Sequence, residues 1–256
     1  KTKKNKDLAV KKMDIGSKFA FTLNMVKKYN SNLECIFIFW HDKKFNFLCK
    51  NFENALKNVI KKDYIAVNLS LINMNVNHAN LLLIDNKLKT IERFDPYGVI
   101  YHNEMNDLDE FVRIQVVTLV EKLTKKKYEY LPPVKYLGNN IFQSISKEED
   151  ANNQNSMEIG GFCLAWCNWY LESRITNPSV HPKKLIVKLN KKLINNNIPI
   201  IEYIRSYSSK IDKARVKIMK EFKFKNQELY KMNLPFDRLK LLYDNIYKEM
   251  CKILLK

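Results

Sequence analysis

The sequence predicts a domain of mixed α and β structure in which helices pack on a sheet. In the first third of the chain, segments with helical periodicity alternate with short runs rich in β-branched and aromatic residues. A turn-forming trio between two apolar runs then predicts a β-hairpin. A long amphipathic pattern follows, and the apolar face of such a helix has to be covered, here by the sheet.

Each element of the first part follows from its local pattern. The elements expected in order are a helix at 19–28, a strand at 34–40, a helix at 52–61 and a strand at 64–73. The runs 81–84 and 89–94 flank the turn-forming residues Asp85, Asn86 and Lys87, so we expect them to pair as the two strands of the hairpin.

Helices dominate the second part of the prediction. Residues 105–125 carry apolar side chains at i, i+3 and i+4, which predicts one long helix packed on the sheet. The other elements expected are a strand at 128–131, a loop at 144–158, a helix at 162–175 that stops near Asn177 and Pro178, and lysine-rich helices beyond Pro182 with breaks at Pro199 and Pro235.

Composition excludes several classes of protein. With 46% hydrophobic residues in 256, the chain can bury a sizeable core, so disorder is not expected. The five cysteines are an odd, scattered set, which argues against a disulfide framework and for a reducing, intracellular compartment such as the cytoplasm, a host cell or a virion. The longest apolar runs have the length of strands, so we expect no membrane span.

The formal net charge of +18 would attract polyanions. However, the lysines are spread over many expected helices, beside abundant Asn and Ile. No glycine-rich phosphate loop, zinc-finger spacing or aromatic nucleic-acid motif accompanies them. We therefore favour solvated surface charge, with nucleic acid as the less favoured partner.

Cys163 has surroundings that the other cysteines lack. It follows Gly160 and Gly161 and opens a helix, where the helix dipole favours a thiolate. The remaining four are expected to be small core residues: Cys35, Cys49, Cys167 and Cys251. Cys163 and Cys167 would be half of a zinc site, but no second Cys or His pair has ligand spacing, so we expect neither metal nor cofactor.

A histidine and an aspartate occupy the two ends of the hairpin. His78 enters the first strand and Asp95 leaves the second, so antiparallel pairing brings them together. An imidazole beside a thiol lowers the thiol pKa, and a carboxylate orients the imidazole. The set His78, Asp95 and Cys163 therefore predicts a cysteine hydrolase, with Glu92 as the alternative carboxylate. The other histidines are expected to be solvated: His41, His102 and His181.

Four motifs follow one another in a fixed order: Asn77-His78-Ala79-Asn80-Leu81-Leu82, Glu92-Arg93-Phe94-Asp95-Pro96-Tyr97-Gly98, Phe142-Gln143, and Gly160-Gly161-Phe162-Cys163-Leu164-Ala165-Trp166-Cys167-Asn168-Trp169-Tyr170-Leu171. Residues 30–180, which contain them, resemble cysteine proteases of the adenain and SUMO-protease clan, the ubiquitin-like-protein protease superfamily. The resemblance is closer to divergent members of this clan encoded by large DNA viruses. The order His, Asp, Gln, Cys differs from the Cys-first order of papain-like enzymes.

The resemblance implies an α+β fold with a central, mostly antiparallel sheet packed on the helix that begins at Cys163. It also implies three parts of the chain. These are an N-terminal helical extension at 1–30, a protease core at 31–180, and a basic helical accessory region at 181–256 that packs on the core.

One family residue is displaced in this sequence. Members of the clan carry a glutamine about half a dozen residues before the cysteine, and its side-chain amide helps to stabilise the oxyanion. Met157 stands at that position. Gln143, in Phe142-Gln143, resembles the viral members' glutamine and is the preferred candidate, with Gln154 as the alternative.

The resemblance implies cleavage of peptide or isopeptide bonds after a small residue such as glycine. Cys163 would attack, His78 would transfer the proton, Asp95 would orient His78, and Gln143 with the Cys163 N–H would stabilise the oxyanion. The expected partner is a protein substrate such as ubiquitin or a ubiquitin-like modifier, bound by a monomer. The alternatives are a viral polyprotein protease, an acetyltransferase on the same fold, and a catalytically inactive binding module.

Overall fold

The computed structural model describes residues 33–41, 44–47, 52–73, 76–98, 102–138, 142, 162–195 and 199–225, with isolated residues between 237 and 248. The described residues fall in two compact units, which divide between Arg205 and Ser206. Residues 32–205 form the unit that contains the sheet. The helix predicted at 19–28, the loop at 144–158 and the break at Pro235 lie outside the described residues. The three-part division of the chain stays a prediction.

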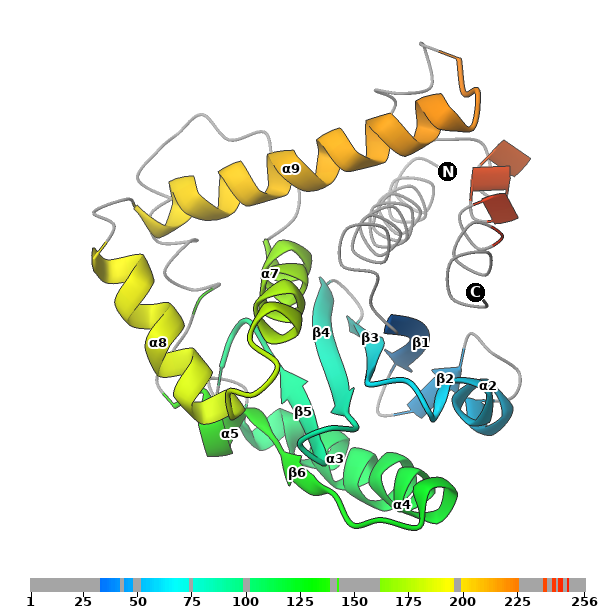
Figure 1. The fold of residues 1–256 in the computed structure, drawn as a ribbon, viewed down its shortest axis with the longest axis vertical. Coiled ribbons are helices and arrows are strands. Elements are labelled where there is room, and N and C mark those ends of the chain that lie inside the picture. The colour runs from blue at the N-terminus through cyan, green and yellow to red at the C-terminus, as the bar shows by residue number, and fades with distance from the viewer. Residues whose placement is uncertain are drawn as a thin grey trace. The chain divides into compact units, whose positions relative to one another are not determined.

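Among the described residues, a six-stranded sheet lies at the centre of the unit formed by residues 32–205, with its strands in the order β2-β1-β3-β4-β5-β6 (Figure 1). Its strands are β1 (Leu33–His41), β2 (Lys44–Phe47), β3 (Tyr64–Asn73), β4 (Val76–Asp85), β5 (Thr90–Phe94) and β6 (Glu129–Leu131). The pairs β1/β2, β3/β4 and β4/β5 are antiparallel, whereas β1/β3 and β5/β6 are parallel. The predicted α+β fold with a mostly antiparallel sheet is confirmed.

The described helices agree with the expected segments, apart from one short helix at Pro133–Tyr136 that has no expected counterpart. They are α2 (Phe52–Val59), α3 (His102–Phe111), the π-helix η1 (Val112–Val117), α4 (Thr118–Thr124), α5 (Pro133–Tyr136), α7 (Cys163–Thr176), α8 (Pro182–Asn195) and α9 (Ile200–Glu221). The long helix predicted at 105–125 is a continuous run of α3, η1 and α4, with the π-helix in its middle. Lys125 ends it in the left-handed conformation.

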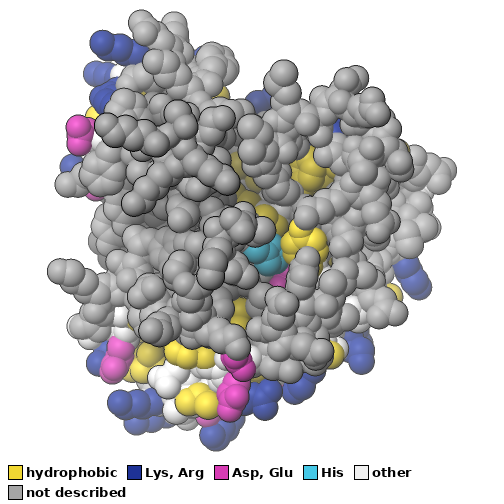
Figure 2. Space-filling view, turned by 180° about the vertical axis from the view of Figure 1, so that it is seen from behind, with side chains coloured by type: hydrophobic (Ala, Val, Ile, Leu, Met, Phe, Trp, Pro, Cys, Tyr) yellow, Lys and Arg dark blue, Asp and Glu magenta, His cyan; other side chains and the backbone are white. Residues whose placement is uncertain are grey.

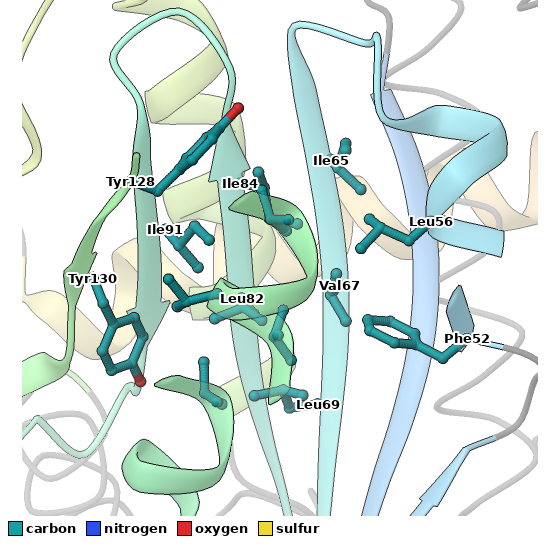
Figure 3. Packing of buried hydrophobic residues seen from close by; sticks show 14 of the residues in the cluster. Phe52, Leu56, Ile65, Val67, Leu69, Leu82, Ile84, Ile91, Tyr128 and Tyr130 are labelled. Carbon is teal, nitrogen blue, oxygen red and sulfur yellow. The ribbon is translucent and has the colours of Figure 1, made fainter. Parts of the chain in front are cut away.

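Helices cover both faces of the sheet. On one face, α2 and the α3-η1-α4 run bury apolar side chains of β3, β4 and β5, such as Val67, Leu82 and Ile91 (Figure 3). On the other face lies α7, where Tyr170 stacks on Phe94 of β5 with ring centroids 4.3 Å apart. The period-two alternation of strand side chains supplies both apolar faces.

The hairpin forms because its first strand ends in an aspartate. The carboxylate of Asp85 accepts hydrogen bonds from the backbone N–H groups of Lys87 and Leu88, at 2.8 and 2.9 Å. Such side-chain capping of the backbone is what makes Asp a turn residue. Lys89 completes the turn in the left-handed region, with φ of 59°. The hairpin fixes the pairing of β4 with β5, and through it the positions of the residues at their far ends.

A buried ionic cluster fixes α7 on β4 and β5. The Arg174 guanidinium donates to Glu92 at 3.0 Å and to Asp85 at 2.8 Å, and all three side chains are fully buried. The Tyr170 hydroxyl donates to Glu92 at 2.6 Å. Arg174 stands eleven residues beyond Cys163 on α7, so this cluster holds the end of the helix that lies far from Cys163.

Replacing Arg174 with methionine should lower the free energy of unfolding by about 3–5 kcal/mol, because it leaves two buried carboxylates without their cation. Urea unfolding followed by tryptophan fluorescence measures the change. Lys184→Met, on the exposed face of α8, is the matched control and should change the value by less than about 0.5 kcal/mol. A loss of less than about 1 kcal/mol for Arg174→Met would show that the cluster contributes little to stability.

Candidate active site

His78 and Asp95 meet at the open end of the hairpin. The pairing of β4 with β5 ends where Leu81 faces Phe94, and Asp95 is the next residue. Beyond this last pair the two chain segments stay close enough for Asp95 to reach His78, and Nε2 of the histidine lies 2.7 Å from Oδ1 of the aspartate. The side chain of His78 is 11% exposed and that of Asp95 is 2% exposed. The dyad is therefore nearly buried, with the imidazole reaching solvent.

The two oxygens of Asp95 have different partners. Oδ1 faces His78 and also accepts the backbone N–H of Tyr97 at 2.9 Å. Oδ2 accepts from the guanidinium of Arg93 at 3.3 Å. Burial would raise the pKa of Asp95, but His78 and Arg93 outweigh it and hold that pKa below the usual value. Asp95 is therefore ionised at neutral pH.

Cys163 is the first residue of α7 and approaches β4 just beyond the end of β5. Its Sγ accepts the backbone N–H of Ala79 at 3.5 Å, and the residue is partly exposed. One turn further along α7, Cys167 is buried and donates from its Sγ to the Ala79 carbonyl at 3.4 Å. Ala79 lies outside the β4/β5 ladder, so its N–H and carbonyl groups find no partner on β5. The two sulfurs bond these backbone groups instead.

The thiol of Cys163 lies close to His78, since its Sγ accepts the N–H of the next residue, Ala79. Burial alone would lower the pKa of His78, but the Asp95 carboxylate and a hydrogen bond and charge from Cys163 raise it to about 9. The Nε2 atom of His78 is taken by Asp95, which leaves Nδ1 for the thiol. An imidazolium held between a carboxylate and a sulfur is the arrangement that stabilises a thiolate.

Aromatic side chains surround this group. The ring of Tyr97 lies 4.7 Å from that of His78. Phe142 packs against Trp166 of α7 at 5.1 Å and against Phe94 at 5.9 Å. The residue before Gln143 therefore lies beside the cysteine helix.

Gln143 and Gln154 both lie outside the described residues, so the choice of oxyanion donor stays a prediction. Of the histidines expected to be solvated, His181 has a 42% exposed side chain. The side chains of His41 and His102 lie outside the described set.

Sequence reasoning missed three polar side chains beside the dyad. Arg93, Asp109 and Asn80 are all buried, and Arg93 donates hydrogen bonds to each of the other two. The sequence indicates such a buried polar network at one place, where two adjacent charged residues, Glu92 and Arg93, interrupt a short strand. Their side chains point to opposite faces, so Glu92 joins Arg174 and is not placed to orient His78.

Neither a cluster of metal ligands nor a membrane-spanning helix occurs in the described part of the chain. Within it, no group of three or more metal-ligating side chains comes together. No helix among the same residues has the length and hydrophobicity that crossing a bilayer requires.

Surface charge is dispersed on the face shown in Figure 2. Among the described residues there, lysine and arginine side chains lie at several separate places, and acidic side chains lie near some of them. Helix α8 exposes a set of lysines, among them Lys183, Lys184 and Lys188. The preference for solvated charge over a polyanion site stays a prediction.

Duplex DNA or heparin should therefore leave the reactivity of Cys163 unchanged at physiological salt, and any binding should weaken steeply as salt rises. The measurement is the rate of Cys163 modification by a small electrophile with and without each polyanion. A polyanion that increased this rate about tenfold at about 0.15 M salt would show that the charge has a specific role.

No family model matches the chain. The putative ankyrin repeat protein L371 of Acanthamoeba polyphaga mimivirus is 33% identical over 178 residues, which are 66% of this chain. The chain spans 23% of the length of that curated relative.

Two solved structures of ChlaDUB1, an effector protein of Chlamydia trachomatis, are similar to this chain. One is 14% identical, with a TM-score of 0.36 over 73% of this chain and 71% of its own. The other is 12% identical, with a TM-score of 0.45 over 89% of this chain and 92% of its own. These scores are too low to establish a common fold.

Proposed function

We propose that this chain is a cysteine protease of the adenain and SUMO-protease clan that removes ubiquitin or a ubiquitin-like modifier by cleaving after glycine. The observation that supports it most is the contact of His78 with the Asp95 carboxylate, together with the hydrogen bond from the N–H of the next residue, Ala79, to the Cys163 thiol. The four ordered motifs support the clan assignment. The mimivirus relative agrees with the resemblance to viral members of this clan.

The proposed reaction uses the thiolate and imidazolium pair. The Cys163 sulfur attacks the carbonyl carbon of the scissile bond, and the resulting oxyanion is stabilised by the Cys163 N–H and the amide of Gln143. His78 then gives its proton to the leaving amine, and the acyl group remains on Cys163 as a thioester. A water molecule, deprotonated by His78, hydrolyses the thioester and restores the thiol. Asp95 orients His78 and stabilises its charged form.

Glycine at the cleavage site follows from the clan resemblance. Such an enzyme needs a narrow groove beside the thiol that admits a Gly-Gly backbone and excludes larger side chains. The same groove and nucleophile would serve a polyprotein protease, and a thioester on Cys163 would serve an acetyltransferase. The identity of the acyl donor separates these functions.

The test is labelling with ubiquitin and with SUMO, each carrying an electrophile at its C-terminus, followed by peptide mapping, alongside an acetyl-CoA transfer assay. We expect one modifier to attach to Cys163, and a matched probe with alanine in place of the penultimate glycine to fail. Acetyl transfer without probe labelling would establish the acetyltransferase. A chain that reacts with neither modifier but cleaves Gly-Gly peptides would be a polyprotein protease, and no reaction at all would indicate a binding module.

A further inference from the structure

A buried arginine adjoins the catalytic dyad. Arg93 precedes Asp95 by two residues, so both side chains lie on the same face of the chain. The side chain of Arg93 is 3% exposed. Its Nη1 atom lies 3.3 Å from Oδ2 of Asp95. Burying a guanidinium is costly unless it is paired, and each of the three nitrogens of this one has a hydrogen-bond acceptor.

Three other contacts fix the guanidinium. Nε and Nη2 donate to the two oxygens of Asp109 on α3, at 2.7 and 2.9 Å. Nη1 also donates to Oδ1 of Asn80 on β4 at 2.6 Å. The Tyr130 hydroxyl of β6 donates to Asp109. The bidentate pair with Asp109 fixes the plane of the guanidinium group, and this plane determines where Nη1 meets Asp95.

The contacts of Asp95 show what this arrangement does. With Oδ2 held by Arg93, Oδ1 is the oxygen that faces His78. The charged groups around the carboxylate are His78 on β4 and Arg93, with Asp109 on α3 as the second carboxylate on the same guanidinium. Without the guanidinium, Asp95 would lose a cation that lowers its pKa, and Oδ2 would lose the partner that holds it. A carboxylate that is protonated or turned away from His78 no longer stabilises an imidazolium.

We propose that Arg93 is a positioning residue that keeps Asp95 ionised and turned toward His78, with Asp109 and Asn80 holding Arg93 in place. The inference rests on the proposed function, since it assigns Arg93 a role in that reaction. Lysine is a poor substitute because a single ammonium does not reproduce the planar fork that joins Asp109, Asn80 and Asp95.

The experiment measures how the alkylation of Cys163 by iodoacetate depends on pH. This anion is drawn to the imidazolium, so in the wild-type chain its rate should fall as pH rises through about 9, where His78 loses its proton. In Arg93→Met this alkaline limb should move to lower pH, toward that of Asp95→Asn, and turnover should fall about 10²-fold. Arg93→Lys should lie between Arg93→Met and the wild type.

The direction of the shift separates positioning from simple charge. If Arg93 acted only as a nearby cation, its removal would raise the pKa of His78 and move the limb upward. A double-mutant cycle is the second readout, since Arg93→Met should add little to the Asp95→Asn variant if it acts through Asp95. Arg174→Lys is the matched control, because it disturbs another buried arginine with two carboxylate partners. It should leave the limb in place while lowering stability.

Each outcome has a separate meaning. A wild-type chain without the alkaline limb would overturn the proposed function itself. If the alkaline limb of Arg93→Met lies at the same pH as that of the wild type or at a higher pH, the role of Arg93 alone is overturned. Additive effects of the two substitutions in the double-mutant cycle would overturn it as well. If Arg93→Met fails to fold, Arg93→Lys and Asp109→Asn carry the same test, with the same direction of shift expected.

Discussion

Replacing Cys163 with alanine should abolish both labelling by a C-terminal electrophilic probe and substrate turnover, because it removes the sulfur that forms the thioester. The folded state should be nearly unaffected. Cys163 is partly exposed, and the hydrogen bond that its Sγ accepts from the Ala79 N–H is long, at 3.5 Å. Probe labelling read by mass spectrometry, with thermal unfolding beside it, measures both quantities.

Cys167→Ala is the matched control for this variant. It removes a thiol one turn further along α7, where the sulfur is buried against the Ala79 carbonyl. We expect it to keep labelling at Cys163 and to lose some stability, since a buried hydrogen bond and packing disappear. Turnover in Cys163→Ala equal to that of the wild-type chain would end the protease proposal.

The second large effect should come from Asp95→Asn, which is expected to slow catalysis by about 10⁴-fold, as the equivalent change does in another triad. Asparagine keeps the size of the side chain but brings no charge to His78. Without that charge, burial lowers the pKa of His78, so the imidazolium that holds the thiolate is lost. Steady-state kinetics on the substrate identified by probe labelling measures the loss.

Glu92→Gln is the informative comparison for Asp95→Asn. Glu92 is the alternative carboxylate in the sequence, but its oxygens are hydrogen-bonded to Tyr170 and Arg174 on the opposite face of β5. Glu92→Gln should therefore lower stability and leave the pH dependence of Cys163 reactivity unchanged. A loss of less than about tenfold for Asp95→Asn would mean that another group orients His78.

The parts of the fold that depend on local pattern could be predicted from the sequence. The β4/β5 hairpin follows from Asp85 and the apolar runs on either side, and the contact between His78 and Asp95 follows from the hairpin. Strand β3 has the predicted bounds, Tyr64–Asn73. The helix that begins at Cys163 is marked by the two glycines before it and by Pro178 after it.

Other features depend on contacts between segments far apart in the chain. The parallel pairings β1/β3 and β5/β6 leave no local signal, because parallel strands are joined by long connections. Strand β2 and the π-helix η1 were not expected either. The network of Arg93 with Asp109 and Asn80 brings together side chains from β5, α3 and β4, so the residue pattern does not reveal it.

The most direct test of the account is the pH dependence of Cys163 alkylation by iodoacetate, compared between the wild-type chain and His78→Ala. The account predicts a bell-shaped profile for the wild-type chain. Its rate rises at a pH well below the ordinary thiol pKa of about 8.5 and falls as His78 loses its proton near pH 9. His78→Ala should show a single rise near the ordinary thiol value. A wild-type profile with that same single rise would contradict the thiolate and imidazolium pair on which the proposed function depends.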